Sequence, residues 1–135
     1  MADPVDQASF AQLVTRFGAL LDSWEAVLRQ VLVQDLSGAG PWALSEADHG
    51  GKSLLVSNGA ATASITLNLP AGAAVGTLIL ADQIGTAPVR LVPANGEVLH
   101  HRLGHNGTAG QWASLHAKCI RPGEWLLAGD TAVVG

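Results

Sequence analysis

Four of the five histidines gather in the last third of the chain. His100, His101 and His105 lie within six residues, and His116 follows on the next predicted strand. Two histidines four residues apart can bind one metal ion when they share a helix face. Gly104 and the Asn-Gly turn after it argue against a helix there. We therefore assign no metal ligand. A histidine repeated around the axis of a trimer stays open as an alternative metal site.

The nucleophile and the acids of the C-terminal half form no recognisable catalytic set. Cys119 is the single cysteine, so the chain has no internal disulfide. It alternates along the chain with Leu115 and Ala117, which predicts a small buried side chain. Glu97, Glu124 and Asp130 fall at predicted strand ends. We expect no catalytic residue, no cofactor and no enzyme activity. A small glycan hydrolase that uses two of these acids is the remote alternative.

The four tryptophans have different predicted roles. Trp24 belongs to an N-terminal helical pattern, and Trp42 follows a proline in a predicted linker, where it could dock into a partner. Trp112 and Trp125 could line a sugar-binding surface or lie in a core or an interface. The sequence leaves this choice open.

Composition excludes several classes of protein. The 135 residues are 48% apolar and only 13% charged, with a net charge of −4. A disordered chain and a nucleic-acid binder built on a basic patch are both disfavoured. The first residues carry two acids and no long apolar run, so we expect synthesis in the cytoplasm, no signal peptide and no membrane partner.

A heptad pattern predicts an N-terminal helix over residues 1–36. Apolar residues recur in alternating steps of three and four, which is the period of a coiled coil. We call this set the heptad seam: Phe10, Leu13, Phe17, Leu20, Trp24, Val27 and Val31. Val14, Leu21 and Leu28 widen the stripe, which favours three or more strands over a tight dimer. An amphipathic helix packed on the chain's own β domain is the alternative.

The rest of the chain predicts a linker and a β domain. Residues 37–52 are rich in Gly, Ser, Pro and Asp, and residues 53–135 are short apolar runs separated by turn residues. The clearest strand runs from Ser64 to Leu69, where polar and apolar residues alternate. Further strands are expected at 53–56, 77–83, 89–92, 97–103, 112–120 and 124–128. The pattern indicates a small antiparallel β-sandwich or barrel.

A shortage of charge indicates that copies of the chain associate. Residues 53–75 carry no charged side chain, although a solitary sheet normally protects its edges with charge. The fold expected is therefore a trimeric α-helical coiled coil followed by the β domain, mainly β overall. A monomeric sandwich with a docked helix is the alternative.

Several short motifs of the β part follow one another in order between Ser64 and Thr131. They are the segments 64–72 with 75–77, 89–96, 108–113 and 125–130, the last being a Trp-x-Leu-x-Gly-Asp ending. This series resembles a domain of tailed-phage head fibres, decoration proteins and tail-fibre tips. The segment His100–His105 departs from the plainer pattern, and the N-terminal helix is outside the match.

The resemblance implies a homotrimeric structural component of a virion. We expect a head decoration protein or capsid fibre, anchored by its N-terminus to capsid or other virion proteins and displaying the β domain. The alternative is a tail-fibre or baseplate tip that binds a host surface glycan. Head and tail attachment stay open, because both use this type of domain.

Overall fold

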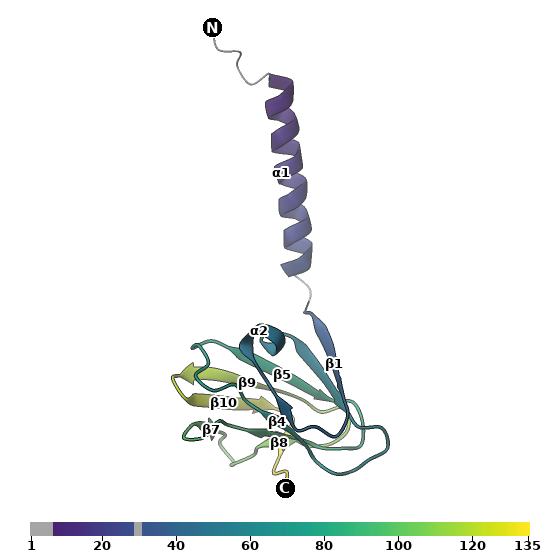
Figure 1. Cartoon of the computed structure of the whole chain (residues 1–135), viewed down its shortest axis with the longest axis vertical. Helices are drawn as coiled ribbons and strands as arrows, with labels where there is room; N and C mark the ends of the chain where they lie inside the picture. The colour runs from purple at the N-terminus through teal and green to yellow at the C-terminus, as the bar shows by residue number, and fades with distance from the viewer. Residues whose placement is uncertain (1–6, 29–30) are drawn as a thin grey trace. The chain divides into compact units, whose positions relative to one another are not determined.

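The computed structural model describes residues 7–28 and 31–135, with side chains for residues 8–25 and from 31 onward. The chain divides into two units, Met1–Val31 and Leu32–Gly135 (Figure 1). The described part of the first unit is one helix, and the second unit is built mainly from two sheets.

The first unit is the helix α1, Gln7–Leu28. At 1.5 Å per residue its 22 residues span about 33 Å. The predicted N-terminal helix is confirmed, but its predicted end at residue 36 is wrong. Val31 lies beyond the helix, and strand β1 begins at Val33. The β-branched Val31 and Val33 favour extended backbone over helix, which explains why the heptad spacing does not continue as a helix there.

The second unit is mainly β, as predicted. Its only helix is the single turn α2, Glu46–His49. The strands are β1 (Val33–Ser37), β2 (Trp42–Ala43), β3 (Ser53–Ser57), β4 (Ile65–Asn68), β5 (Leu78–Gln83), β6 (Val89–Val92), β7 (Val98–His100), β8 (Gly107–Thr108), β9 (Ser114–Arg121), β10 (Glu124–Gly129) and β11 (Thr131–Ala132). The predicted linker over residues 37–52 is wrong, because this segment carries β2 and α2 and belongs to the β unit.

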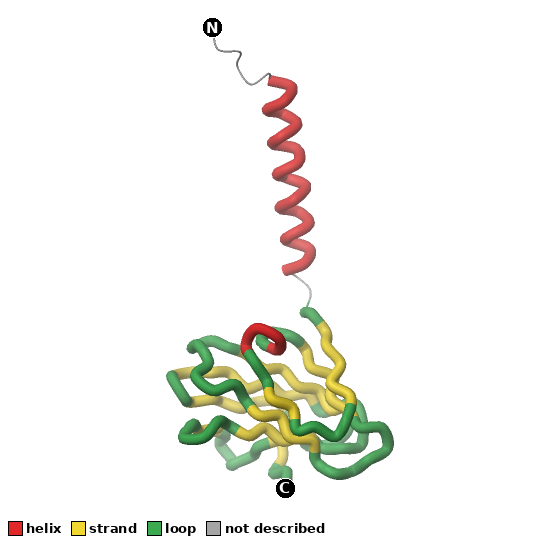
Figure 2. Tube along the Cα trace, viewed as in Figure 1, coloured by secondary structure: helices red, strands yellow, loops and turns green. Residues whose placement is uncertain are grey.

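The chain winds alternately through two sheets (Figure 2). The odd strands β1, β3 and β5 pair in parallel in a six-stranded sheet, and the even strands β2, β4 and β6 pair in parallel in a five-stranded sheet. Each coil therefore stacks on the previous one, as in a solenoid. The antiparallel sandwich or barrel expected from the sequence is wrong for these six strands.

Antiparallel pairing is confined to the C-terminal strands. β9 pairs with β5 on one side and with β10 on the other, and β8 pairs with β6 and β11. β7 returns to the parallel arrangement beside β10. The last strands thus complete both sheets after the solenoid coils end, and the orders are β1-β3-β5-β9-β10-β7 and β11-β8-β6-β4-β2.

One apolar core joins the two sheets. Alternate residues of each strand point inward, so that Leu54 and Val56 of β3 meet Ile65 and Leu67 of β4 with no side-chain exposure. Trp125 of β10 is fully buried in the same cluster. The choice left open by the sequence is settled for this tryptophan, which is a core residue and does not line a surface.

Candidate functional site

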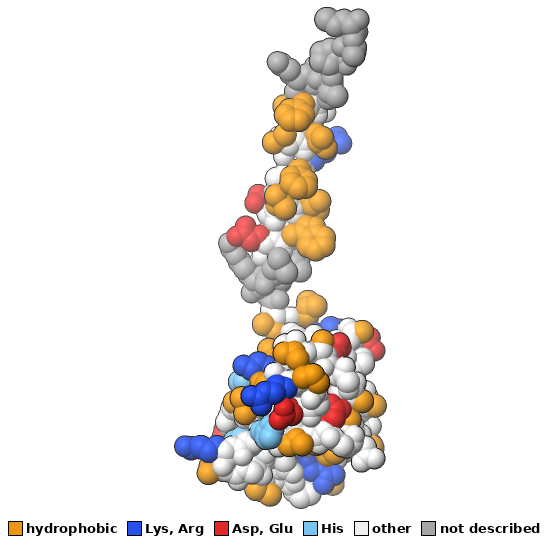
Figure 3. Space-filling view, turned by 90° about the vertical axis from the view of Figure 1, so that its left-hand side faces the viewer, with side chains coloured by type: hydrophobic (Ala, Val, Ile, Leu, Met, Phe, Trp, Pro, Cys, Tyr) orange, Lys and Arg blue, Asp and Glu red, His pale blue; other side chains and the backbone are white. Residues whose placement is uncertain are grey.

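The heptad seam lies on α1 and is exposed. Its five members with described side chains, Phe10, Leu13, Phe17, Leu20 and Trp24, are 52–62% exposed (Figure 3). The flanking Val14 and Leu21 are also more than half exposed. The side chain of Val27 lies outside the described residues, and Val31 lies beyond the helix. The helix therefore presents a wide apolar stripe to solvent.

Trp42 is part of the β unit's own packing. It opens β2, pairs in register with Leu67 of β4 and packs against the core. Gly40 lies so close that an added Cβ would stand 3.0 Å from the Trp42 ring. The docking hypothesis for Trp42 depended on an isolated apolar residue in a linker, and the structure places the residue in a sheet instead.

His101 and His105 form the one stacked ring pair among the described residues. Their ring centroids are 4.5 Å apart, with 13° between the planes. The hydroxyl of Thr131 lies 3.1 Å from His101 Nε2 and 2.9 Å from His105 Nδ1. His101 Nδ1 accepts from the backbone N–H groups of Leu103 and His105. This nitrogen therefore carries no proton, and the network assigns the ring proton to Nε2.

The environment of His101 opposes its positive charge. Partial burial, the neighbouring His105 and then Arg102 lower the pKa of His101 below its usual 6.5. The other two histidines are elsewhere: His100 pairs with Glu124 at 3.0 Å, and His116 lies on the solvent side of β9. Across residues 7–28 and 31–135, no group of three or more His, Cys, Asp or Glu side chains is arranged to hold a metal ion.

Cys119 is buried in the core at 1% exposure. Burial first, and then Glu97 and Glu46, raise the pKa of its thiol, while its hydrogen bond to the Arg121 carbonyl opposes the shift. A buried thiol with a raised pKa holds little thiolate near neutrality. The side chain is a packed core residue, as the sequence predicted.

The three candidate acids do not all lie together. Glu97 and Glu124 come to the same corner, since Val98 and Glu124 are paired across β7 and β10, and Asp130 lies at the other end of β10. Glu124 is engaged by His100 and, at 3.7 Å, by Arg121. Glu97 Oε1 is buried without a hydrogen-bond partner in the described structure.

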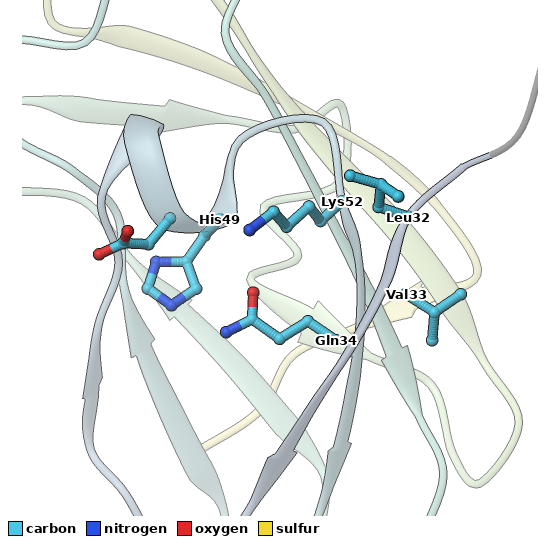
Figure 4. Close-up of a pocket in the computed structure, with 6 residues that line it drawn as sticks. Leu32, Val33, Gln34, His49 and Lys52 are labelled. Atoms are coloured by element: carbon cyan, nitrogen blue, oxygen red, sulfur yellow. The ribbon is translucent and has the colours of Figure 1, made fainter. Parts of the chain in front are cut away.

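Two shallow hollows mark the surface of the β unit. One, of about 440 Å³, lies beside α2, where the ends of the Lys52 and Gln34 side chains face the ring of His49 (Figure 4). His49 Nδ1 accepts from the Ser45 N–H, so its Nε2 is left to donate. The second, of about 560 Å³, is lined in part by Arg90, Glu97 and His105. Both offer polar groups to a small polar molecule.

The sequence left Trp112 open between a sugar-binding surface and a core or an interface, and the structure places its side chain at the surface. Trp112 is 72% exposed and has φ of +71°, in the left-handed region. The segment Gly110–Trp112 has no turn signature that would place a tryptophan there, so the sequence offered no signal for this conformation.

No helix among the described residues has the length and hydropathy needed to span a membrane. Comparisons of the chain with protein-family models, with curated proteins and with solved structures gave no match.

Proposed function

We propose that this chain is a homotrimeric structural protein of a phage particle. Its N-terminal helix joins three copies and, with the residues before it, attaches them to the virion. The β unit is then displayed from the shell as a head decoration or capsid fibre. The virion part of the proposal rests on the motif resemblance of residues 64–131, and the oligomer part rests on the heptad seam.

The exposure of the heptad seam is the observation that carries the proposal. Burial of a Leu, Val or Phe side chain is worth about 1.5–3 kcal/mol, and a helix in a protein gains most of its stability from packing of its apolar face. Seven apolar side chains from Phe10 to Trp24, each more than half exposed, therefore favour association with an external partner. A heptad spacing is the pattern that lets sister helices bury one another.

The width of the stripe supports three helices. Val14 and Leu21 lie beside the seam and would stay partly exposed in a two-stranded coil. The bulky Phe10, Phe17 and Trp24 at one heptad position also need the wider interior of a three-stranded bundle. A trimer links three attachment points, which raises the effective concentration of each on a shell built from many weak contacts.

The test is the location of the protein on phage particles made from the genome that encodes it. Gold-labelled antibody raised against residues 32–135 is applied to purified particles and viewed by electron microscopy. We expect label on the head. Particles from the same genome with this gene deleted are the control and should carry no label.

Two other results would contradict this assignment. Label found only on tails would show that the protein is a tail-fibre or baseplate tip and not a head protein. Particles that lack the protein altogether, while the chain accumulates in infected cells, would remove the virion role.

A further inference from the structure

Trp112 has a strained backbone conformation whose free-energy cost is not offset by burial of its side chain. It lies between β8 and β9 with φ of +71°, where a Cβ crowds the backbone and glycine is the preferred residue. Its side chain is 72% exposed, so burial returns little of the conformational cost. A non-glycine residue kept in this region at the surface points to a role outside folding.

The backbone around Trp112 is fixed on both sides. The Trp112 N–H donates to the Gln83 carbonyl at 2.7 Å, and the Gln83 N–H donates to the Ala113 carbonyl at 2.9 Å. Gln83 is only 2% exposed and is itself anchored to the hydroxyl of Thr108 and the carbonyl of Gly85. The indole is therefore presented from a rigid base, which lowers the entropy lost on binding.

The loops beside Trp112 carry no charge. Segments 57–64, 84–88 and 109–113 contain no Asp, Glu, Lys, Arg or His. Hydrogen bonds join them: Gln111 Nε2 donates to the Ile84 carbonyl at 3.0 Å, and the Thr86 hydroxyl donates to the Ala61 carbonyl at 2.9 Å. These segments therefore offer no positively charged side chain to an anionic ligand.

We propose that Trp112 binds a neutral sugar residue of a glycan, together with the exposed polar side chains of its neighbour Gln111 and of Thr86 on the loop to which Gln111 is bonded. An indole face offers apolar area for the C–H face of a pyranose ring, and amide and hydroxyl groups at its rim match sugar hydroxyls. A tryptophan that anchors a protein partner usually lies within a packed apolar patch. The segments 57–64, 84–88 and 109–113, in contrast, consist mostly of small and polar residues. The site does not depend on the proposed virion role.

The test uses the full chain on an array of oligosaccharides built from glucose, galactose and N-acetylglucosamine, with sialylated and sulfated forms of the same chains. We expect binding to at least one neutral glycan and weaker binding to its anionic forms. Titration calorimetry with that glycan should show a loss of affinity of tenfold or more in Trp112→Gly and Trp112→Ala.

Trp112→Gly also separates binding from folding. Glycine relieves the left-handed backbone, so its thermal midpoint should equal or exceed that of the wild-type chain while binding is lost. Val133→Ala, which changes another side chain that is 72% exposed, is the matched control and should bind normally. No binding to any neutral glycan, a preference for anionic forms, or unchanged affinity in Trp112→Ala would each overturn the proposal. So would a loss of self-association in Trp112→Ala without glycan binding by the wild-type chain.

Discussion

At the residue scale, the protonation state of His101 bears on the stability of the loop that follows β7. His101 Nδ1 accepts two backbone N–H groups, and a proton on that nitrogen would break both bonds. This geometry agrees with the lowered pKa of His101, which has partial burial as its first cause. The loop that follows β7 is therefore more stable when the His101 ring is neutral.

The first prediction concerns acid pH. Because the folded pKa of His101 is lowered, the unfolded chain binds this proton first as pH falls below about 6.5. The contribution of His101 to the free energy of unfolding is therefore present above pH 6.5, declines as pH falls through 6.5, and levels off below the folded pKa. Titration of the histidine ring signals by NMR should place His101 below 6.5.

His101→Asn supplies the control, because the Asn Oδ1 can accept the same backbone bonds and does not titrate. The drop in thermal midpoint between pH 7.5 and pH 5 should be smaller in this variant. A His101 ring that titrates at or above 6.5 would contradict the account of the loop.

A second residue-scale prediction concerns the buried link between the sheets. Thr108 of β8 accepts from the Val89 N–H and donates to Gln83 Oε1 of β5, and both polar side chains are 2% exposed. Thr108→Val keeps the shape but leaves two buried polar groups unpaired, each costing about 1–3 kcal/mol. We expect the free energy of unfolding in urea to fall by about 2–4 kcal/mol.

Two variants control this measurement. Thr108→Ser keeps the hydroxyl and should recover most of the loss. Thr62→Val makes the same exchange at an exposed position and should change the free energy of unfolding by no more than about 0.5 kcal/mol. Equal free energies of unfolding for Thr108→Val and the wild-type chain would show that these two hydrogen bonds do not stabilise the fold.

At the scale of elements, we propose that α1 gains its stability from association with sister helices. Phe17→Glu combined with Leu20→Glu places two charges on the heptad seam. We expect the double variant to be a single chain at micromolar concentration, with a weaker helical signal at 222 nm. The β unit should still unfold cooperatively, because its core contains no residue of α1.

The matched control carries the same two charges on the other face of α1. Gln12→Glu combined with Thr15→Glu lies away from the seam by the helical period, and it should keep the wild-type mass. A seam variant that also keeps the wild-type mass would show that these side chains do not join the copies.

Elements were predicted better than their connections. The heptad spacing located α1, and alternation located β4, because both periods follow directly from side-chain direction. The parallel winding was missed because a turn such as Asn58-Gly59 ends a strand without saying whether the next strand returns to the same sheet. Here it leads from β3 in one sheet to β4 in the other.

The sequence predicted the heptad seam but left the exposure of Trp112 open, because only the seam is a repeated local pattern. The apolar seam is a repeated pattern, so the sequence identified it before its exposure was known. The left-handed conformation of Trp112 follows from hydrogen bonds to Gln83, which is distant in sequence. Burial of Trp125 depends likewise on which sheet faces it, and the sequence left that residue open.

At the scale of the whole molecule, the two units differ in how far they bury their own apolar side chains. The β unit encloses its own core, whereas the helix exposes the side chains that a core would bury. We therefore propose that copies of the chain bury these side chains against one another through α1, and that each copy contributes one β unit to the assembly.

Sedimentation equilibrium of the full chain at micromolar concentration tests this claim most directly. The account predicts a single species with about three times the 13.8 kDa mass of one chain. A stable species with the mass of one chain would contradict it.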